Sequence, residues 1–232
     1  MNSETLHERL RWLATRAADL LRAEGASGLL KGIGRLFRDN RRGLFSHERF
    51  VIYETNTAAY EKGIVAPPVE ALEVHVLHNE QDVERLAAAG YEDVRRVMKP
   101  TVRRLRGGAI GFIAYVNRDV AHADWVAPTA EAKASLLDLL PYRVAFAEGE
   151  VSWSGGYTVG RFRGLGLYRY VMALALRYCR EHGYHVVVAA VAVDNAPSHR
   201  NHIRYGSRVR ARGRHLHVLR WSRWTEECQG DV

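Results

Sequence analysis

The chain reads YTVGRFRGLGLY from residue 157 to residue 168, and this segment says more about the fold than any other part of the sequence. It leads from a strand-like segment through a glycine-rich turn into a segment with helical periodicity. Glycines let a backbone approach a ligand closely, and the N–H groups of a first helical turn have no partner within the helix. The turn therefore predicts an anion site at a helix N-terminus, where Arg161 and Arg163 add positive charge.

Strands and helices alternate on both sides of this turn. The helix after it, residues 165–182, is amphipathic, and a strand of Val and Ala follows at residues 185–193. Further strands are predicted at residues 72–77, 109–116, 120–126, 142–159, 207–211 and 215–221, and further helices at residues 81–89, 91–104, 130–140 and 198–205, the last capped by Ser198. This order predicts an α/β domain built on one central sheet.

Composition limits the class of protein. The chain has 232 residues, of which 47% are apolar and 26% charged, as is ordinary for a globular domain. No apolar run approaches the roughly 20 residues that a membrane-spanning helix needs. Cys179 and Cys228 cannot form a disulfide framework or a complete zinc site, and the first residues lack a signal-peptide core. We therefore expect a cytoplasmic protein.

The net charge of +8 indicates an anionic partner, and part of that charge lies near the N-terminus. Residues 1–50 show two apolar stripes at helical spacing, the second flanked by basic residues, and predict a basic amphipathic helical arm. The main domain is expected at residues 51–225 and a tail at residues 226–232. Two interpretations of the arm stay open. It covers the domain or a homodimer partner, or residues 1–45 lie on an anionic membrane surface, at the inner face of the membrane.

At the glycine-rich turn the chain resembles the GNAT family of acyl-CoA-dependent N-acyltransferases. The family's cofactor motif, Gln/Arg-x-x-Gly-x-Gly/Ala, matches residues 161–166, and its commoner wording, an aromatic residue and then Arg-Gly-x-Gly, matches residues 162–166. Further along, residues 195–198 resemble the family's Asn-x-x-Ser segment, and residues 203–206 its helix-end turn. The resemblance covers roughly residues 72–221.

The resemblance implies a GNAT-like acyltransferase fold, whose mixed central sheet splays between the fourth and fifth strands. It also implies acetyl-CoA, or another acyl-CoA, as co-substrate, with the pantetheine arm in that gap. The positions implied to bind it are Tyr157 and Val159 through their backbone, Arg163, Gly164, Leu165, Gly166 and Leu167 at the pyrophosphate, and Asn195 and Ser198 along the pantetheine arm. The chain departs from the family at Tyr168, where Gly or Ala is usual.

Acyl transfer to an amine needs a base for the amine's proton and an acid for the departing thiolate. The family often places a Tyr four residues before the glycine of the helix-end turn as that acid, and here this position holds His202. A histidine of ordinary pKa can donate a proton near neutral pH. Glu148 and Glu150, on the strand before the turn, are the candidate bases. The structural alternatives are a surface helix residue for His202 and solvated hairpin residues for the two glutamates.

The prediction is thus an N-acetyltransferase that moves an acyl group, most simply acetyl, from CoA to an amine of a small, anionic or membrane-associated acceptor by direct attack. Two alternatives stay open. Tyr168, together with His202 in place of Tyr, favours a catalytically silent CoA-binding or membrane-associated scaffold. The alternating arginines of residues 208–214 favour a nucleic-acid-binding module, although no such module is recognised in the sequence. No metal is expected, because the His and Cys residues lack a ligand spacing.

Overall fold

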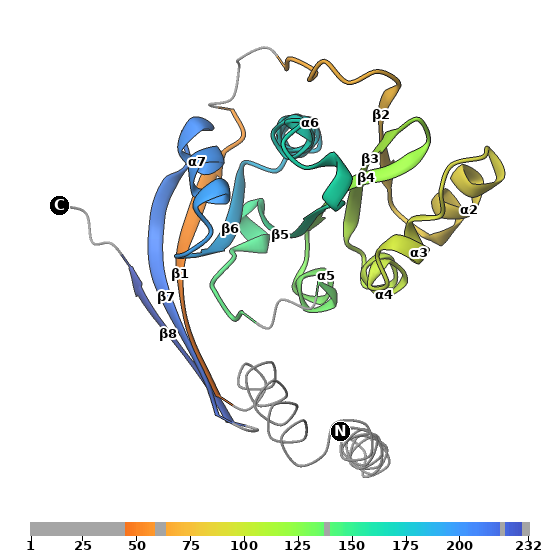
Figure 1. Cartoon of the computed structure of the whole chain (residues 1–232). Helices are drawn as coiled ribbons and strands as arrows, with labels where there is room; N and C mark the ends of the chain where they lie inside the picture. Colours follow the sequence, from red (N-terminus) through yellow and green to blue (C-terminus); the bar gives the residue numbers. More distant parts are fainter. Residues whose placement is uncertain (1–44, 59–63, 137–139, 219–220, 229–232) are drawn as a thin grey trace, which may run out of the picture. The chain divides into compact units, whose positions relative to one another are not determined.

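The computed structural model describes residues 45–58, 64–136, 140–218 and 221–228. Strands and helices alternate along most of the chain, which confirms the predicted α/β class (Figure 1). In chain order the elements are β1 (Phe45–Asn56), β2 (Leu72–Leu77), α2 (Glu80–Ala88), α3 (Val94–Val97), α4 (Thr101–Arg106), β3 (Ile110–Val116), β4 (Asp119–Ala127), α5 (Ala130–Ser135), η1 (Phe146–Glu148), β5 (Glu150–Thr158), η2 (Gly160–Phe162), α6 (Leu167–Glu181), β6 (Val186–Ala192), α7 (Ala196–Arg204), β7 (Arg208–Val218) and β8 (Trp221–Cys228).

The strands form one mixed sheet in the order β2-β3-β4-β5-β6-β1-β7-β8. Strands β5 and β6 run parallel, because α6 connects them and carries the chain back to its starting edge. The pairs β2–β3, β3–β4, β4–β5 and β1–β6 are antiparallel. By its contacts the chain divides into two units, Met1–Glu48 with His215–Arg223, and Arg49–Arg214 with Trp224–Val232. The candidate site described below lies in the second unit.

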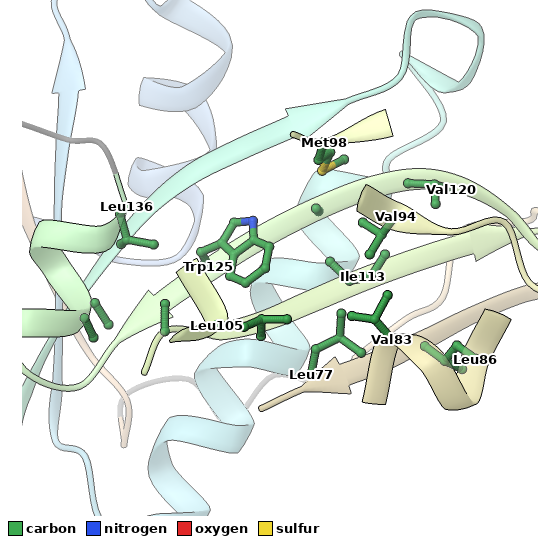
Figure 2. Close-up of a cluster of buried hydrophobic side chains, with 14 of the residues drawn as sticks. Leu77, Val83, Leu86, Val94, Met98, Leu105, Ile113, Val120, Trp125 and Leu136 are labelled. Atoms are coloured by element: carbon green, nitrogen blue, oxygen red, sulfur yellow. The ribbon is translucent and has the colours of Figure 1, made fainter. Parts of the chain in front are cut away.

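Strand β3 is buried along its whole length, so it needs cover on both faces. Successive side chains of a strand point to opposite faces. Ile113 and Tyr115 accordingly belong to a cluster that includes residues of α2 and α4, shown around Trp125 in Figure 2. Phe112 and Ala114 belong to a second cluster, formed with the apolar face of α6. In Figure 1, α6 lies on one side of these strands and α2 to α5 lie on the other.

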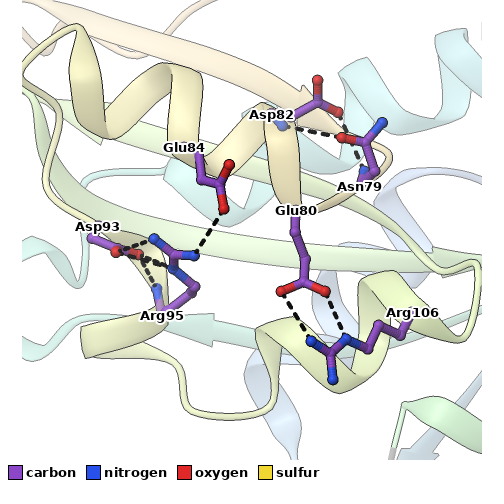
Figure 3. Close-up of polar contacts among 7 residues, drawn as sticks. All are labelled: Asn79, Glu80, Asp82, Glu84, Asp93, Arg95 and Arg106. Carbon is purple, nitrogen blue, oxygen red and sulfur yellow. Dashed lines mark hydrogen bonds and ion pairs between the residues drawn. The ribbon is translucent and has the colours of Figure 1, made fainter.

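Helix α2 begins at a capping box. The Asn79 side chain accepts a hydrogen bond from the backbone N–H of Asp82, whose carboxylate accepts one from the backbone N–H of Asn79 (Figure 3). These bonds satisfy N–H groups that a helix leaves unpaired at its start. Glu80 of the same helix pairs with Arg106 of α4 at 2.6 Å. Because Arg106 is largely exposed, this ion pair contributes at most about 1 kcal/mol.

The structure corrects four predicted elements. Residues 91–104 form two short helices, α3 and α4, because proline at position 100 favours an extended residue before it and breaks the helix. The strand predicted over residues 142–159 begins only at Glu150, after the η1 turn. Helix α7 begins at Ala196 and is capped by Asn195 rather than Ser198. The turn predicted between the strands at residues 207–211 and 215–221 is not formed: residues 208–218 are one strand, β7, and Trp221 begins the next strand, β8.

Strand β1 is absent from the sequence prediction. It lies beside β6, with Phe50 opposite Ala192 and Asn56 opposite Val186. Of the helical arm predicted at residues 1–50, residues 1–44 lie outside the described residues, and the last six belong to β1 and are strand rather than helix. The proposed contact of residues 1–45 with a membrane therefore stays a prediction. No helix in the described ranges is long and apolar enough to cross a membrane.

Candidate active site

The sheet opens between β5 and β6, the fourth and fifth of the strands predicted from the sequence. Their parallel pairing runs from Glu150 opposite Val186 to Trp153 opposite Ala189 and continues no further. Beyond that point β5 stays paired with β4, and β6 stays paired with β1. Each strand therefore keeps a partner on its outer side, while the inner sides of the two strands part.

A cavity of about 660 Å³ lies where the strands part. Its walls come from β4, β5, β6, the glycine-rich turn, α6 and α7. The predicted cofactor residues that line it are Gly164, Gly166, Asn195 and Ser198. The structure thus brings the glycine-rich turn and the Asn-x-x-Ser segment, about 30 residues apart in the chain, to the walls of one cavity.

The N-terminus of α6 is open to an anion. Its N-cap is Gly166, with φ of 80°, a left-handed conformation that glycine adopts without strain. Among the residues that the structure describes, no side chain caps the helix, and its first turn holds no acidic residue, so its N–H groups and the positive end of the helix dipole there are free to meet an anion. Arg163 lies beside this turn and donates from Nε to the carbonyl of Thr158 at 3.3 Å. Arg161 is instead paired with Asp119 at 2.9 Å.

The remaining predicted cofactor residues differ in exposure and in whether their backbone groups are already hydrogen-bonded. Tyr157 is 46% exposed, and its backbone lies opposite Ala123 of β4. Both backbone groups of Val159 are bonded within the chain, because its N–H donates to Ala121 and its carbonyl accepts from Phe162. The Val159 N–H is therefore not available to a pantetheine arm, whereas its carbonyl oxygen can accept a second hydrogen bond, and the expectation for Val159 stays a prediction. Leu165 is exposed, whereas the side chain of Leu167 is buried and packs below the helix start.

Two buried polar side chains at the cavity wall were not among the predicted site residues. His122 and Asp124 of β4 are each 1% exposed, and His122 Nε2 lies 3.2 Å from Asp124 Oδ2. The indole N–H of Trp153 donates to Asp124 Oδ1 at 2.7 Å. On its other side, His122 Nδ1 lies 2.8 Å from the hydroxyl of Thr158. The sequence signal for this pair is two polar residues at i and i+2 within residues 120–126, which are otherwise Val, Ala and Trp.

Strand β5 passes directly over the Asp124 carboxylate. A Cβ atom at Gly156 would lie 2.7 Å from Asp124 Oδ1, so this position admits no side chain without a local shift. The register between β4 and β5 also slips between Ala123 and Trp125, which marks an irregularity beside the buried pair. Irregular pairing re-aims side chains in a strand. Glycine at this position thus allows the close approach of Asp124 to the β5 backbone at the cavity wall.

Tyr168, the position at which the chain departs from the GNAT pattern, lies in the first turn of α6 and lines the cavity. Its ring meets the His122 ring edge-on, with centroids 5.7 Å apart. Burial, and after it the Asp124 carboxylate, raises the pKa of Tyr168, while a hydrogen bond with Ser198 lowers it. The phenol therefore stays protonated at neutral pH.

His202 lines the cavity from α7 and is 3% exposed. The ring of Tyr53 stacks on its ring with centroids 4.7 Å apart, and its Nδ1 lies 3.3 Å from the hydroxyl of Ser207. Burial, with a smaller contribution from His199, lowers the pKa of His202 to about 4. At pH 7 it is thus a neutral imidazole, a far weaker acid than the imidazolium on which the predicted proton-donor role depends.

Glu148 and Glu150, the predicted bases, are not brought to the cavity. Glu148 is an exposed residue of the η1 turn. Glu150 begins β5 at the closed end of the β5–β6 pair, where it binds Arg210 at 2.8 Å and accepts the backbone N–H of Ala145 at 2.7 Å. In the structure Glu150 thus pairs with Arg210 and does not line the cavity. In the described part of the chain, no three His, Cys, Asp or Glu residues gather as a metal site.

A comparison with models of protein families shows which family the chain matches. Residues 77–206, more than half of the chain, match the model of the Acetyltransferase (GNAT) family. This stretch contains the parted strands, the glycine-rich turn, the Asn-x-x-Ser segment and the buried pair on β4. No curated protein matches the chain.

Several solved structures are similar at low identity. The GCN5-related N-acetyltransferase from Kribbella flavida is 14% identical, with a TM-score of 0.46 over 90% of this chain and 65% of that one. The one from Sphaerobacter thermophilus is 13% identical, with a TM-score of 0.46 over 90% and 59%. A GNAT-family acetyltransferase from Colwellia psychrerythraea is 12% identical, with a TM-score of 0.45 over 80% and 57%. The chain thus spans 57 to 65% of the length of these three proteins.

Proposed function

The chain belongs to the acetyltransferase (GNAT) family, and we propose that it transfers an acyl group, most simply acetyl, from a CoA thioester to a primary amine. The observation that carries this proposal is the cavity between the parted strands β5 and β6, which reaches the uncapped N-terminus of α6. An elongated arm fits between strands whose inner sides have parted, and a pyrophosphate suits free N–H groups at a helix start. The acceptor amine is unidentified.

Different residues of this chain would bind different parts of the acyl-CoA. The backbone amides from Gly164 to Leu167 and the guanidinium of Arg163 would hold the pyrophosphate, since a helix start and an arginine both favour a dianion. Asn195 and Ser198 line the cavity farther along, where the arm would lie. The thioester supplies a carbonyl carbon that an amine can attack. Trp153 and Tyr168 line the cavity in contact with the buried pair, where they would keep water from it.

Titration calorimetry with acetyl-CoA tests the binding part of this proposal. We expect micromolar binding by the wild type, and a loss of about tenfold to a hundredfold in the Arg163→Glu variant, because a charge-assisted contact is replaced by repulsion. Arg180→Glu is the matched control. It makes the same change of charge on an exposed residue in the last turn of α6, away from the proposed pyrophosphate site, and should bind as the wild type does.

Two results would contradict the proposal. If neither acetyl-CoA nor longer acyl-CoAs bind to the wild type, the cavity is not a CoA site. If acetyl-CoA binds but no thiol is released with amino acids, polyamines, amino sugars or peptide amino termini, the chain binds CoA without turnover. That second outcome would favour the alternative of a silent CoA-binding scaffold over an acyltransferase.

A further inference from the structure

A chain of hydrogen-bonding groups leads from the cavity into the sheet. It starts at the hydroxyl of Thr158, a half-buried residue that ends β5, and passes 2.8 Å to His122 Nδ1. From His122 Nε2 it passes 3.2 Å to Asp124 Oδ2, whose other oxygen is held by Trp153 at 2.7 Å. Thr158, His122 and Asp124 all line the cavity, yet the last two are almost fully buried. A molecule in the cavity would meet this chain first at the Thr158 hydroxyl.

The donors and acceptors of these hydrogen bonds indicate that Nδ1 of His122 can act as a base. An indole N–H can only donate, so Asp124 Oδ1 is an acceptor, as a carboxylate oxygen should be. An ionised Asp124 then accepts a hydrogen bond from His122 Nε2–H through its second oxygen. This places the imidazole lone pair on Nδ1, where it can accept a hydrogen bond from the hydroxyl of Thr158. A base oriented by a carboxylate and bonded to a hydroxyl is the arrangement that moves protons in many enzymes.

We propose that Thr158 and His122 carry away the proton that the acceptor amine loses during acyl transfer. The N–H bond of the attacking amine breaks as the Thr158 oxygen takes that proton, and Thr158 passes its own proton to His122 Nδ1. Asp124 positions the imidazole and stabilises its charged form. Across the whole reaction one proton moves from the amine nitrogen to the thiol sulfur, and the imidazole holds it in between. This inference rests on the proposed acyltransferase function.

The groups in contact with His122 are consistent with this role. Asp124, on its own strand, is the carboxylate that would stabilise an imidazolium. Tyr168, on α6, packs edge-on and stays neutral, so it adds no charge that would oppose one. If His122 and Asp124 only stabilised the fold, they would not need the contact with Thr158. Thr158 is therefore the residue that distinguishes a structural role of this pair from a role in proton transfer.

The first test needs no substrate. In protein labelled with ¹⁵N-histidine, we expect the nitrogen chemical shifts of His122 to show the Nε2–H tautomer, with Nδ1 as a hydrogen-bond acceptor; His122→Gln identifies the signal. In Thr158→Val, which keeps the β-branched shape and removes only the hydroxyl, the Nδ1 shift should move to that of an unbonded acceptor. The Nδ1–H tautomer, or an imidazolium that persists at neutral pH, would overturn the proposal.

The second test measures thiol release from acetyl-CoA with the amine panel above as a function of pH. Thr158→Val should lower kcat about a hundredfold, the size of a general-base effect, and leave the KM for acetyl-CoA unchanged. Thr158→Ser, which restores a hydroxyl, should recover most of the rate. Ser152→Ala is the control, because it removes a buried hydroxyl from the same strand, one that bonds Tyr142 at 2.7 Å and does not line the cavity. It should keep the wild-type rate and pH profile.

The outcomes separate this inference from the function on which it rests. Equal rates and pH profiles in the wild type and Thr158→Val would overturn the proton route alone. An acyl group found on the Thr158 oxygen by mass spectrometry would also overturn it, because Thr158 would then be a nucleophile. A wild-type protein that neither binds acetyl-CoA nor releases thiol would overturn the acyltransferase function, and the proton route with it.

Discussion

Acidification from pH 7 to about pH 4 is expected to remove about 3 kcal/mol of the free energy of unfolding through one side chain, His202. Burial holds the pKa of this histidine at about 4 in the folded protein, against 6.5 for an unperturbed histidine. At pH values between about 4 and 6.5, His202 is therefore protonated in the unfolded chain but not in the folded protein. The stability that depends on neutral His202 is therefore complete above pH 6.5 and is lost progressively as the pH falls to about 4.

Urea unfolding at several pH values between 7 and about 4 measures this effect. The His202→Gln variant should lose less stability on acidification than the wild type, by up to about 3 kcal/mol, because glutamine does not titrate. His182→Gln is the matched control, because it makes the same substitution at a histidine that is exposed at the end of α6. Parallel curves for the wild type and His202→Gln would show that His202 titrates normally in the folded protein.

The Trp125→Ala variant is expected to lose about 3–5 kcal/mol of the free energy of unfolding. Trp125 is among the largest fully buried side chains, and Figure 2 shows it at the centre of the cluster between the sheet and α2 to α5. The Arg104 guanidinium lies over its ring at 5.2 Å and would lose that contact as well. Within the described residues the indole N–H has no hydrogen-bond partner, so the expected loss comes from packing and from the contact with Arg104 and includes no hydrogen bond.

Chemical denaturation of two companion variants identifies the cause. Trp125→Phe should cost clearly less than Trp125→Ala, because it keeps an aromatic ring in the cluster and deletes an N–H that bonds nothing there. Ile203→Ala, at a residue of α7 that is 68% exposed, should change stability by no more than about 0.5 kcal/mol. A loss in Trp125→Ala no larger than that of Ile203→Ala would mean that the cluster is loosely packed.

Much of the fold and part of the site could be predicted from local sequence. The glycine-rich turn predicts an open helix start, and α6 begins there at Leu167. The run of Val and Ala predicts the buried strand β6. Such features depend on the chemistry of a few neighbouring residues, because backbone conformation and periodicity act over short stretches of chain. The resemblance to the GNAT family could be stated on the same local motifs, and the family match over residues 77–206 confirms it.

The tertiary structure decided which side chains meet at the cavity. His122 and Thr158 are 36 residues apart, and only the pairing of β4 with β5 brings them within 2.8 Å. His202 has the sequence context of a helix-surface residue, but Tyr53 of β1 stacks on it, and burial takes its pKa far from an ordinary value. By itself the sequence determined the turn, the helix start and the family. Burial and contacts between distant strands decided which side chains of the cavity can take up or release a proton. This is because desolvation and hydrogen bonding depend on neighbours in space rather than in the chain.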